Sequence, residues 1–398
     1  MYPTKKLWET WNIIRWVSYS KWDLLEKFQE WCVTLLRANN INNWLNTDEL
    51  QFLPKELINS EKILQKNDII FCMSSWSRDL VWKNTIIPKI ENYSFGAFCS
   101  ALRLNKDTNP YFISYFLQTT TYKNYIRNLW KWWNILNLRN SDLQNLPIPL
   151  PPLPTQQKIV FKLDFLFEKL DQAITLTKQN LASIEELNKS ILEKIFTECK
   201  EKYEKKKLGE VCEIIWWWTP KTEISEYWKD EIVWLSPTDL PEIWEIIEIN
   251  NSAKKISKLW LEKSSAKILP KWTVIFSSRA TIWKIAISTI ELSTNQWFAN
   301  FICSEKIFNK FLAYTLKNFT KNIINLSNST TFKEVNKTNL RSFQIPLPPL
   351  SEQQKIVEYL DNIFAEHQKL KNLYQAQIKN LDEMKQSFLK KAFAGELV

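Results

Sequence analysis

The chain has 398 residues and a formal net charge of +10 at pH 7, with 53 lysines and arginines against 43 acidic residues. This length allows two or three domains with cores of their own, and the excess of positive charge favours a polyanionic partner. The sequence contains neither a run of 18 uncharged apolar residues nor a signal-peptide pattern, so we expect a protein that neither crosses a membrane nor is secreted.

Histidine and cysteine usage limits the chemistry further. The chain has one histidine and six cysteines, and no two cysteines show Cys-x-x-Cys spacing. These ligands are too few and too scattered for a structural zinc site. Scattered cysteines are also typical of a reducing compartment. We therefore predict a cytoplasmic protein that holds no metal ion and no cofactor.

The first globular segment, residues 1–153, mixes short β-branched and aromatic runs with turn residues. Residues 68–72 predict a buried strand, and residues 110–117 predict a short helix. Arg78 and Lys83 follow the strand, on either side of a predicted turn. A guanidinium and an ammonium in such a turn suit contact with phosphates or base edges, although an ordinary charged hairpin would show the same pattern.

A proline-rich segment, residues 147–154, ends this domain. Proline runs favour an extended polyproline II conformation and stop a helix from continuing backwards. The position of the segment between a domain and a helix favours a stiff hinge. A ligand for a proline-recognition domain is the alternative.

A spacer helix is predicted behind these prolines, within residues 154–205. Apolar residues recur from Leu163 to Ile195 at steps of mostly three and four, with charged residues between them. This is the pattern of a long amphipathic helix. A helix of about 40 residues is about 60 Å long and cannot bury its apolar stripe alone.

The second half of the chain repeats the first. Residues 148–160, Ile-Pro-Leu-Pro-Pro-Leu-Pro-Thr-Gln-Gln-Lys-Ile-Val, return 197 positions later as residues 345–357. A second domain with its own proline hinge is therefore predicted for residues 206–350, and a second spacer helix for residues 351–398. We expect the two helices to pack on each other, antiparallel, with a pseudo-two-fold axis relating the halves. The alternative is that each helix lies on its own domain.

Tryptophan is frequent and glycine rare, with 21 and 3 residues, where ordinary chains contain about 7% glycine. Trp297 aligns with Gly96 at an offset of 201. We hypothesise that UGA codons, which some bacterial lineages read as glycine, were translated here as tryptophan at every position except Trp228 and Trp234. The affected residues should then lie at turns and on the surface, not in cores. The alternative takes the aromatics literally, as stacking platforms for single strands.

Several motifs together resemble the specificity subunit of type I restriction-modification systems. They are the Pro-Leu-Pro-Pro-Leu-x-x-Gln-Gln-Lys-Ile-Val hinge, the helix ending in Ser-Phe-Leu-Lys-Lys-Ala-Phe-Ala-Gly-Glu-Leu, and the order domain, helix, domain, helix. The resemblance covers essentially the whole chain, and the tryptophan excess is the main departure from the family. It implies an α+β fold, in which two similar α/β target-recognition domains are joined by two long antiparallel coiled-coil helices with pseudo-two-fold symmetry.

The resemblance also implies a non-catalytic function. Each domain would read one half of a bipartite double-stranded DNA site, and the helices would set the spacing. The partners implied are double-stranded DNA, methyltransferase (modification) subunits and restriction (motor) subunits. At an offset of 201, Arg279 and Lys284 align with the basic turn of the first domain. We expect the DNA-facing surface to contain eight residues: Arg37, Asn39, Arg78, Lys83, Arg279, Thr281, Lys284 and Gln296.

Catalytic motifs are not found in the sequence. No glycine-rich nucleotide loop is present, even when tryptophans are read as glycine. Residues 109–112, Asn-Pro-Tyr-Phe, have a faint likeness to an adenine-methyltransferase motif, but its second proline is missing and the segment begins a predicted helix. His367 falls on the second spacer helix, where the first has Leu170. No catalytic residue is therefore predicted.

Two other functions remain open at this point. A fragment of a fused restriction or methyltransferase enzyme would require cofactor and nuclease motifs. A protein-assembly scaffold that does not read sequence would show no salt-dependent binding to a duplex.

Overall fold

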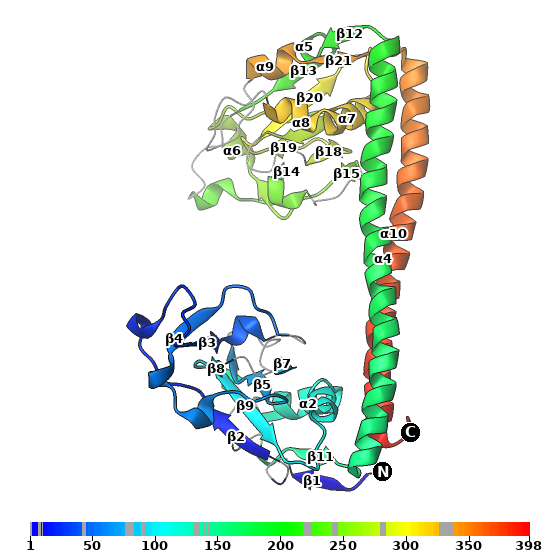
Figure 1. The fold of residues 1–398 in the computed structure, drawn as a ribbon. Helices are drawn as coiled ribbons and strands as arrows, with labels where there is room; N and C mark the ends of the chain where they lie inside the picture. The colour runs from blue at the N-terminus through cyan, green and yellow to red at the C-terminus, as the bar shows by residue number, and fades with distance from the viewer. Residues whose placement is uncertain are drawn as a thin grey trace. The chain divides into compact units, whose positions relative to one another are not determined.

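The two repeats of the chain form two compact units in the computed structural model (Figure 1). The first unit comprises Met1–Leu176 and Gln377–Val398, and the second comprises Thr177–Ala376. The structure describes residues 2–6, 9, 11–41, 45–75, 83–88, 92–129, 136–137, 141, 144–217, 224–240, 246–278, 284–325 and 337–398.

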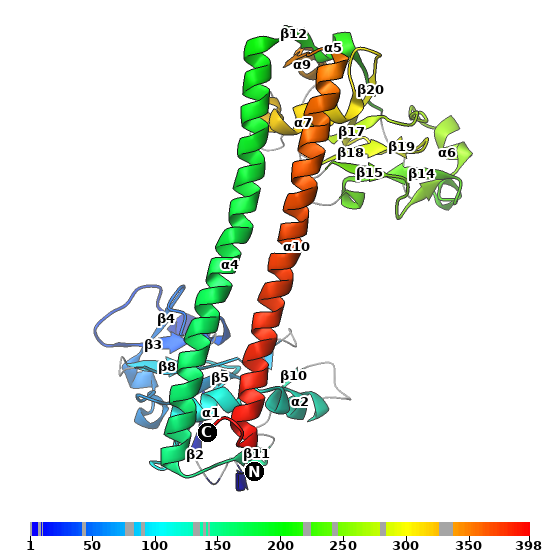
Figure 2. The ribbon, with the colours of Figure 1, turned by 90° about the vertical axis from the view of Figure 1, so that its right-hand side faces the viewer.

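Two long helices contribute to both units: α4 (Leu153–Lys202) and α10 (Leu350–Ala394), of 50 and 45 residues. They confirm the two long helices predicted from the sequence. Figures 1 and 2 show the helices side by side. None of the helices in the described part of the chain is long and apolar enough to span a membrane.

Contacts within each unit show that α4 and α10 run antiparallel. In the second unit, Glu185 Oε1 of α4 lies 3.5 Å from Lys371 Nζ of α10. Asn188, which comes later in α4, is hydrogen-bonded to His367, which comes earlier in α10. In the first unit, Asp171 of α4 pairs with Lys385 of α10. The prediction that the two helices pack on each other is confirmed. His367 has a structural partner, Asn188, on the facing helix.

The second unit is built on a five-stranded sheet, in which only β18 and β15 run parallel. One face is covered by α7 (Asn309–Asn318), α8 (Thr320–Asn325) and parts of both long helices, and Phe311 and Phe276 are fully buried there. The strands, in order across the sheet, are β13 (Cys212–Ile215), β20 (Phe298–Cys303), β17 (Val274–Ser277), β18 (Ile285–Ser288) and β15 (Ile247–Ile249).

The other face of this sheet shares a core with a smaller sheet. Ile275 and Ala286 pack with Leu235 and Ile256 in one buried cluster. The alternation of inward and outward residues along each strand lets one sheet serve two cores. The smaller sheet has the order β16 (Lys255–Ile256), β14 (Ile232–Leu235), β19 (Ser293–Thr294), and the remaining helices of the unit are α5 (Leu208–Val211), α6 (Lys258–Glu262) and α9 (Lys337–Ser342).

The first unit repeats this plan. A four-stranded sheet, a three-stranded sheet and a pair of helices occupy the same places in the order of elements. The four-stranded sheet has the order β2 (Trp11–Arg15), β9 (Cys99–Leu104), β5 (Ile69–Cys72), β7 (Asn84–Ile86). The three-stranded sheet has the order β4 (Gln51–Pro54), β3 (Cys32–Leu36), β8 (Tyr93–Phe95). The others are α1 (Pro110–Phe116), α2 (Thr120–Leu129), β6 (Ser74–Ser75) and β10 (Leu136–Asn137).

Each proline segment begins with a strand and continues as irregular backbone, residues 150–152 and 347–349, up to the long helix, and the prediction of a polyproline hinge did not include the strands. β11 (Pro147–Pro149) pairs antiparallel with β1 (Thr4–Lys6), and β21 (Gln344–Pro346) pairs antiparallel with β12 (Lys205–Lys207). Proline lacks a backbone N–H and is tolerated in such two-stranded edge pairs. The pairing partner in each unit lies more than a hundred residues away, so no local pattern could predict it.

One glutamine of each Gln-Gln pair joins the hinge, the long helix and the domain. The Gln156 side chain accepts from Asn109 N (2.8 Å) and donates to Pro151 O (2.8 Å). Gln353 accepts from Phe308 N (2.8 Å) and donates to Pro348 O (2.8 Å). Both side chains are buried. The repeated motif therefore has a structural role.

The tryptophans only partly follow the expectation that they avoid cores. Trp272 adopts φ 68° and is 53% exposed, and Asn67 adopts φ 72° at the equivalent turn of the first unit. This left-handed region is costly for a bulky residue. Trp217 and Trp260, however, are buried, so the expectation is wrong for these two.

The alignment of Trp297 with Gly96 is also wrong. Ser278 N donates to Trp297 O as Met73 N donates to Phe98 O, so Trp297 is equivalent to Phe98 in the structure. The loops between the strands differ in length, and the offset therefore changes along the chain.

Candidate nucleic-acid interface

Three loops of the second unit meet at one end of its three-stranded sheet. The first follows β14 at Ser236, the second follows β19 at Asn295, and the third follows β17 at Ser278. Asn295 N donates to Leu235 O (2.9 Å), and Ser278 N donates to the carbonyl at the end of the second loop (2.7 Å). Because β14 and β19 are parallel, both end at the same edge of the sheet.

Lys284 ties these loops together. Its backbone N–H donates to Ser277 Oγ (3.1 Å), directly before the third loop. Its ammonium donates to Pro237 O (3.0 Å) and Leu240 O (2.6 Å), in the loop after β14. The side chain is half-buried. A charged donor on two backbone carbonyls fixes the shape of that loop, so Lys284 holds the turn in place as well as adding positive charge near it.

The loop after β14 is a short, internally bonded turn. Ser236 N donates to Asp239 Oδ2 (2.7 Å), and Asp239 Oδ1 accepts from Ala253 N (3.2 Å) in the neighbouring loop. Thr238 between them is exposed. An exposed hydroxyl on a fixed turn is a donor and acceptor that could meet a base edge or a phosphate.

The first unit has the same arrangement. Arg37 N donates to Asn40 Oδ1 (2.9 Å) in the turn that follows β3, as Ser236 does in the second unit. Gly96 N donates to Leu36 O (3.0 Å), which ties the loop after β8 to this turn. The Arg37 guanidinium donates to Glu49 O (2.9 Å), and Asn39 is exposed on the turn.

The five predicted site residues that the structure describes lie in or next to these loops, each within its own unit. Arg37 and Asn39 share the turn after β3. Lys284 and Gln296 come from two of the three converging loops of the second unit. Lys83 occupies the place of Lys284 in the first unit, because Cys72 N donates to Lys83 O as Ser277 N donates to Lys284 O. The remaining three lie outside the described residues: Arg78, Arg279 and Thr281.

The turn of Ser236, Thr238 and Asp239 was not among the predicted site residues. The sequence could have indicated this turn, because its three residues lie 199 positions after Arg37, Asn39 and Asn40. This correspondence was missed because the two repeats were aligned at the offset of 201 that matches the basic turns.

Among the described residues, no group of three His, Cys, Asp or Glu side chains could hold a metal ion. Asn109 caps α1, with Oδ1 accepting from Tyr111 N (2.9 Å) and Phe112 N (3.2 Å), so residues 109–112 form a helix start.

Comparisons with known proteins agree on one family. The model of the type I restriction modification DNA specificity domain matches residues 36–186 and 200–380. The type I restriction enzyme StySPI specificity subunit of Salmonella potsdam is 28% identical over 97% of this chain and 87% of its own length. The type I restriction enzyme EcoKI specificity subunit of Escherichia coli is 35% identical over 40% of this chain and 35% of its own length.

Solved structures show the same fold. A chain from a study of the assembly and conformational transition of the type I R-M system has a TM-score of 0.81 at 21% identity, covering 100% of this chain and 98% of its own. The HsdS subunit of Thermoanaerobacter tengcongensis has a TM-score of 0.58 at 18% identity, with 100% and 97% covered.

Proposed function

The chain belongs to the family of the type I restriction modification DNA specificity domain, and we propose that it selects the DNA sequence on which a type I restriction-modification complex acts. Its role is recognition without catalysis. The observation that supports this most strongly is that the segments leaving three strands are hydrogen-bonded to one another at the same edge of the small sheet in both units. Two similar loop clusters suit a target that has two parts.

Each unit reads one half of a bipartite duplex site in this proposal. Arg37, Asn39, Lys83, Lys284 and Gln296 belong to the reading surface, together with Arg78, Arg279 and Thr281. The two long helices set the distance between the half-sites and dock the methyltransferase subunits, with restriction subunits completing the complex. The proposed place of action is the cytoplasm, which is consistent with six free cysteine thiols.

Arg279→Ala tests the proposal. A bidentate arginine–guanine contact contributes roughly 1–3 kcal/mol of discrimination. We expect the variant, assembled with methyltransferase subunits, to lose base preference in one half-site of a randomised library while the other half-site keeps its preference. Methylation of the library reports both. Arg341→Ala, on α9 of the same unit and outside the three loops, is the matched control.

Two outcomes would contradict the proposal. Unchanged preference at both half-sites in Arg279→Ala would remove this residue from the reading surface. A wild-type complex that binds duplexes without dependence on sequence or salt would instead favour the scaffold function. Lys284→Ala should disturb the turn after β14, because its ammonium holds two carbonyls there.

A further inference from the structure

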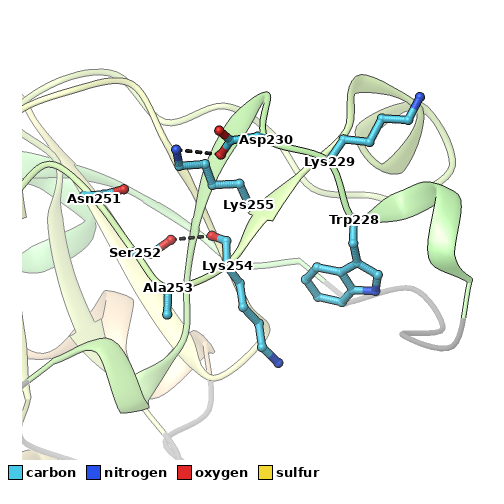
Figure 3. Close-up of a pocket in the computed structure, with 8 residues that line it drawn as sticks. All are labelled: Trp228, Lys229, Asp230, Asn251, Ser252, Ala253, Lys254 and Lys255. Atoms are coloured by element: carbon cyan, nitrogen blue, oxygen red, sulfur yellow. Dashed lines mark hydrogen bonds and ion pairs between the residues drawn. The ribbon is translucent and has the colours of Figure 1, made fainter.

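A basic pocket lies beside the reading surface of the second unit (Figure 3). Its volume is about 560 Å³. It is lined by the segment before β14 and the segment before β16, and three of its residues are lysines, against one aspartate. The lining residues are Trp228, Lys229, Asp230, Asn251, Ser252, Ala253, Lys254 and Lys255.

Two of the lysines are held in place by neighbours. The Lys254 ammonium lies 5.4 Å from the centroid of the Trp228 ring, so the aromatic face positions a charge at the pocket. Lys255 Nζ lies 2.6 Å from Asp230 Oδ1, and this pairing offsets its charge. Lys229 extends from the same rim, away from the Trp228 ring (Figure 3). Lys254 is therefore the pre-positioned cation that an anion would meet.

The pocket is joined to the reading surface by a direct bond. Ala253 N donates to Asp239 Oδ1 (3.2 Å), in the turn after β14. Trp234 N donates to Lys254 O (3.2 Å), which fixes the lysine segment on the strand that leads into that turn. A duplex whose bases meet the turn would bring its phosphate backbone past this pocket, because phosphates flank every base contact.

The first unit lacks the pocket's charges at the equivalent positions. Strand register places Gln51 and Phe52 where the second unit has Lys254 and Lys255. Phe52 makes an edge contact with Phe28, with ring centroids 5.7 Å apart. The corresponding edge of the first unit is thus polar and aromatic without a lysine at either place.

We propose that this pocket is a phosphate-binding site for the DNA that flanks one half-site, so that the second unit holds its half-site with a stronger dependence on salt than the first. The inference rests on the proposed function of DNA recognition. Lys254 contacts a backbone phosphate, Trp228 orients Lys254, and Asp230 limits the contribution of Lys255. Such a contact adds affinity for every sequence alike and changes no base preference.

Lys254→Ala and Asp230→Asn test the site with opposite signs. The probe is a duplex containing the target found by methylation profiling, bound to the complex of this chain with its methyltransferase subunits at about 50 and 200 mM salt. One phosphate contact contributes about 0.9 to the salt slope, which is about 3.5-fold in affinity between these conditions. The salt slope of Lys254→Ala should be smaller than that of the wild type by this amount. Asp230→Asn should steepen the slope, because Lys255 is released.

Controls separate the possible failures. Lys263→Ala removes one exposed lysine from the same unit outside the pocket and should leave the slope at the wild-type value. Methylphosphonate substitutions beside the second half-site, tested with wild-type protein, should reduce the slope in the same way without any variant. An unchanged slope in Lys254→Ala would overturn the site, as would a loss of methyltransferase binding with the slope intact, since the pocket would then hold an acidic protein surface. A wild-type complex without selective duplex binding would instead overturn the proposed function.

Discussion

Gln353 Oε1 accepts a hydrogen bond of 2.8 Å from the backbone N–H of Phe308, which links the first turn of α10 to the start of α7. The same side chain donates to Pro348 O and Lys306 O, at 2.8 and 3.1 Å. One buried amide thus joins three segments of the second unit.

Gln353→Ala should lower the free energy of unfolding by about 2–4 kcal/mol, because buried backbone groups would lose their partner. Gln354→Ala is the matched control, since this neighbouring glutamine is exposed and should change stability by less than about 0.5 kcal/mol. Urea unfolding of both variants gives the comparison. Equal effects of the two substitutions would contradict the role of the inward-facing amide.

Trp272→Gly should stabilise the protein by about 1 kcal/mol, because a left-handed conformation costs a bulky residue about 1–2 kcal/mol and glycine adopts it freely, at some cost in chain entropy. Trp260→Gly, at a fully buried position, should destabilise it by about 3–5 kcal/mol. Thermal unfolding distinguishes the two. Peptide mass spectrometry of the protein from its native host should find glycine at position 272, and tryptophan there would refute the UGA hypothesis at this turn.

Stability should fall at alkaline pH through Cys199. Burial raises the pKa of this thiol from 9.0 to about 11, with a smaller contribution from Glu198. The stabilisation is complete below about pH 9, where both states keep the proton, and is lost as pH rises toward 11, because only the unfolded state then releases it. The advantage of wild type over Cys199→Ala in urea unfolding should shrink by about 1–2 kcal/mol between about pH 8 and 10.5. A constant difference would contradict this.

Removing seven residues from both α4 and α10 should shorten the spacer between the half-sites. Seven residues are two helical turns and about 10 Å, roughly three base pairs at 3.4 Å each. This number also keeps the apolar stripe in phase. Methylation profiling of the shortened complex measures the new spacer, and an unchanged spacer would refute a role of the helices in spacing.

The helices were the part of the fold that the sequence predicted best. Apolar residues at steps of three and four depend only on local geometry, and α4 and α10 begin and end within a few residues of the predicted bounds. The strands β11 and β21 were missed because their partners are distant in sequence. Neither could the sequence tell which of Gln353 and Gln354 faces inward, since this depends on how the helix is rotated against the domain.

The site was predicted by residue type more than by role. Lys284 was chosen as a basic residue beside a predicted turn, but its bonds to Pro237 O and Leu240 O span more than forty residues and follow from tertiary packing. Arg37 and Asn39 were chosen as DNA-facing residues, and the structure shows that both belong to one turn. Their counterparts Ser236 and Thr238 were missed because insertions change the offset between the repeats.

The first unit is made of two separate segments of the chain, and this affects the order in which the units can fold during translation. Its core contains Leu389 and Ala392, and the Phe393 ring lies 4.9 Å from that of Phe112. A ribosome makes these residues long after the sheet they cover, whereas the second unit is one continuous stretch of chain. During translation, the second unit is therefore completed before the first. The first unit can bury its hydrophobic core only after the last turns of α10 have been made.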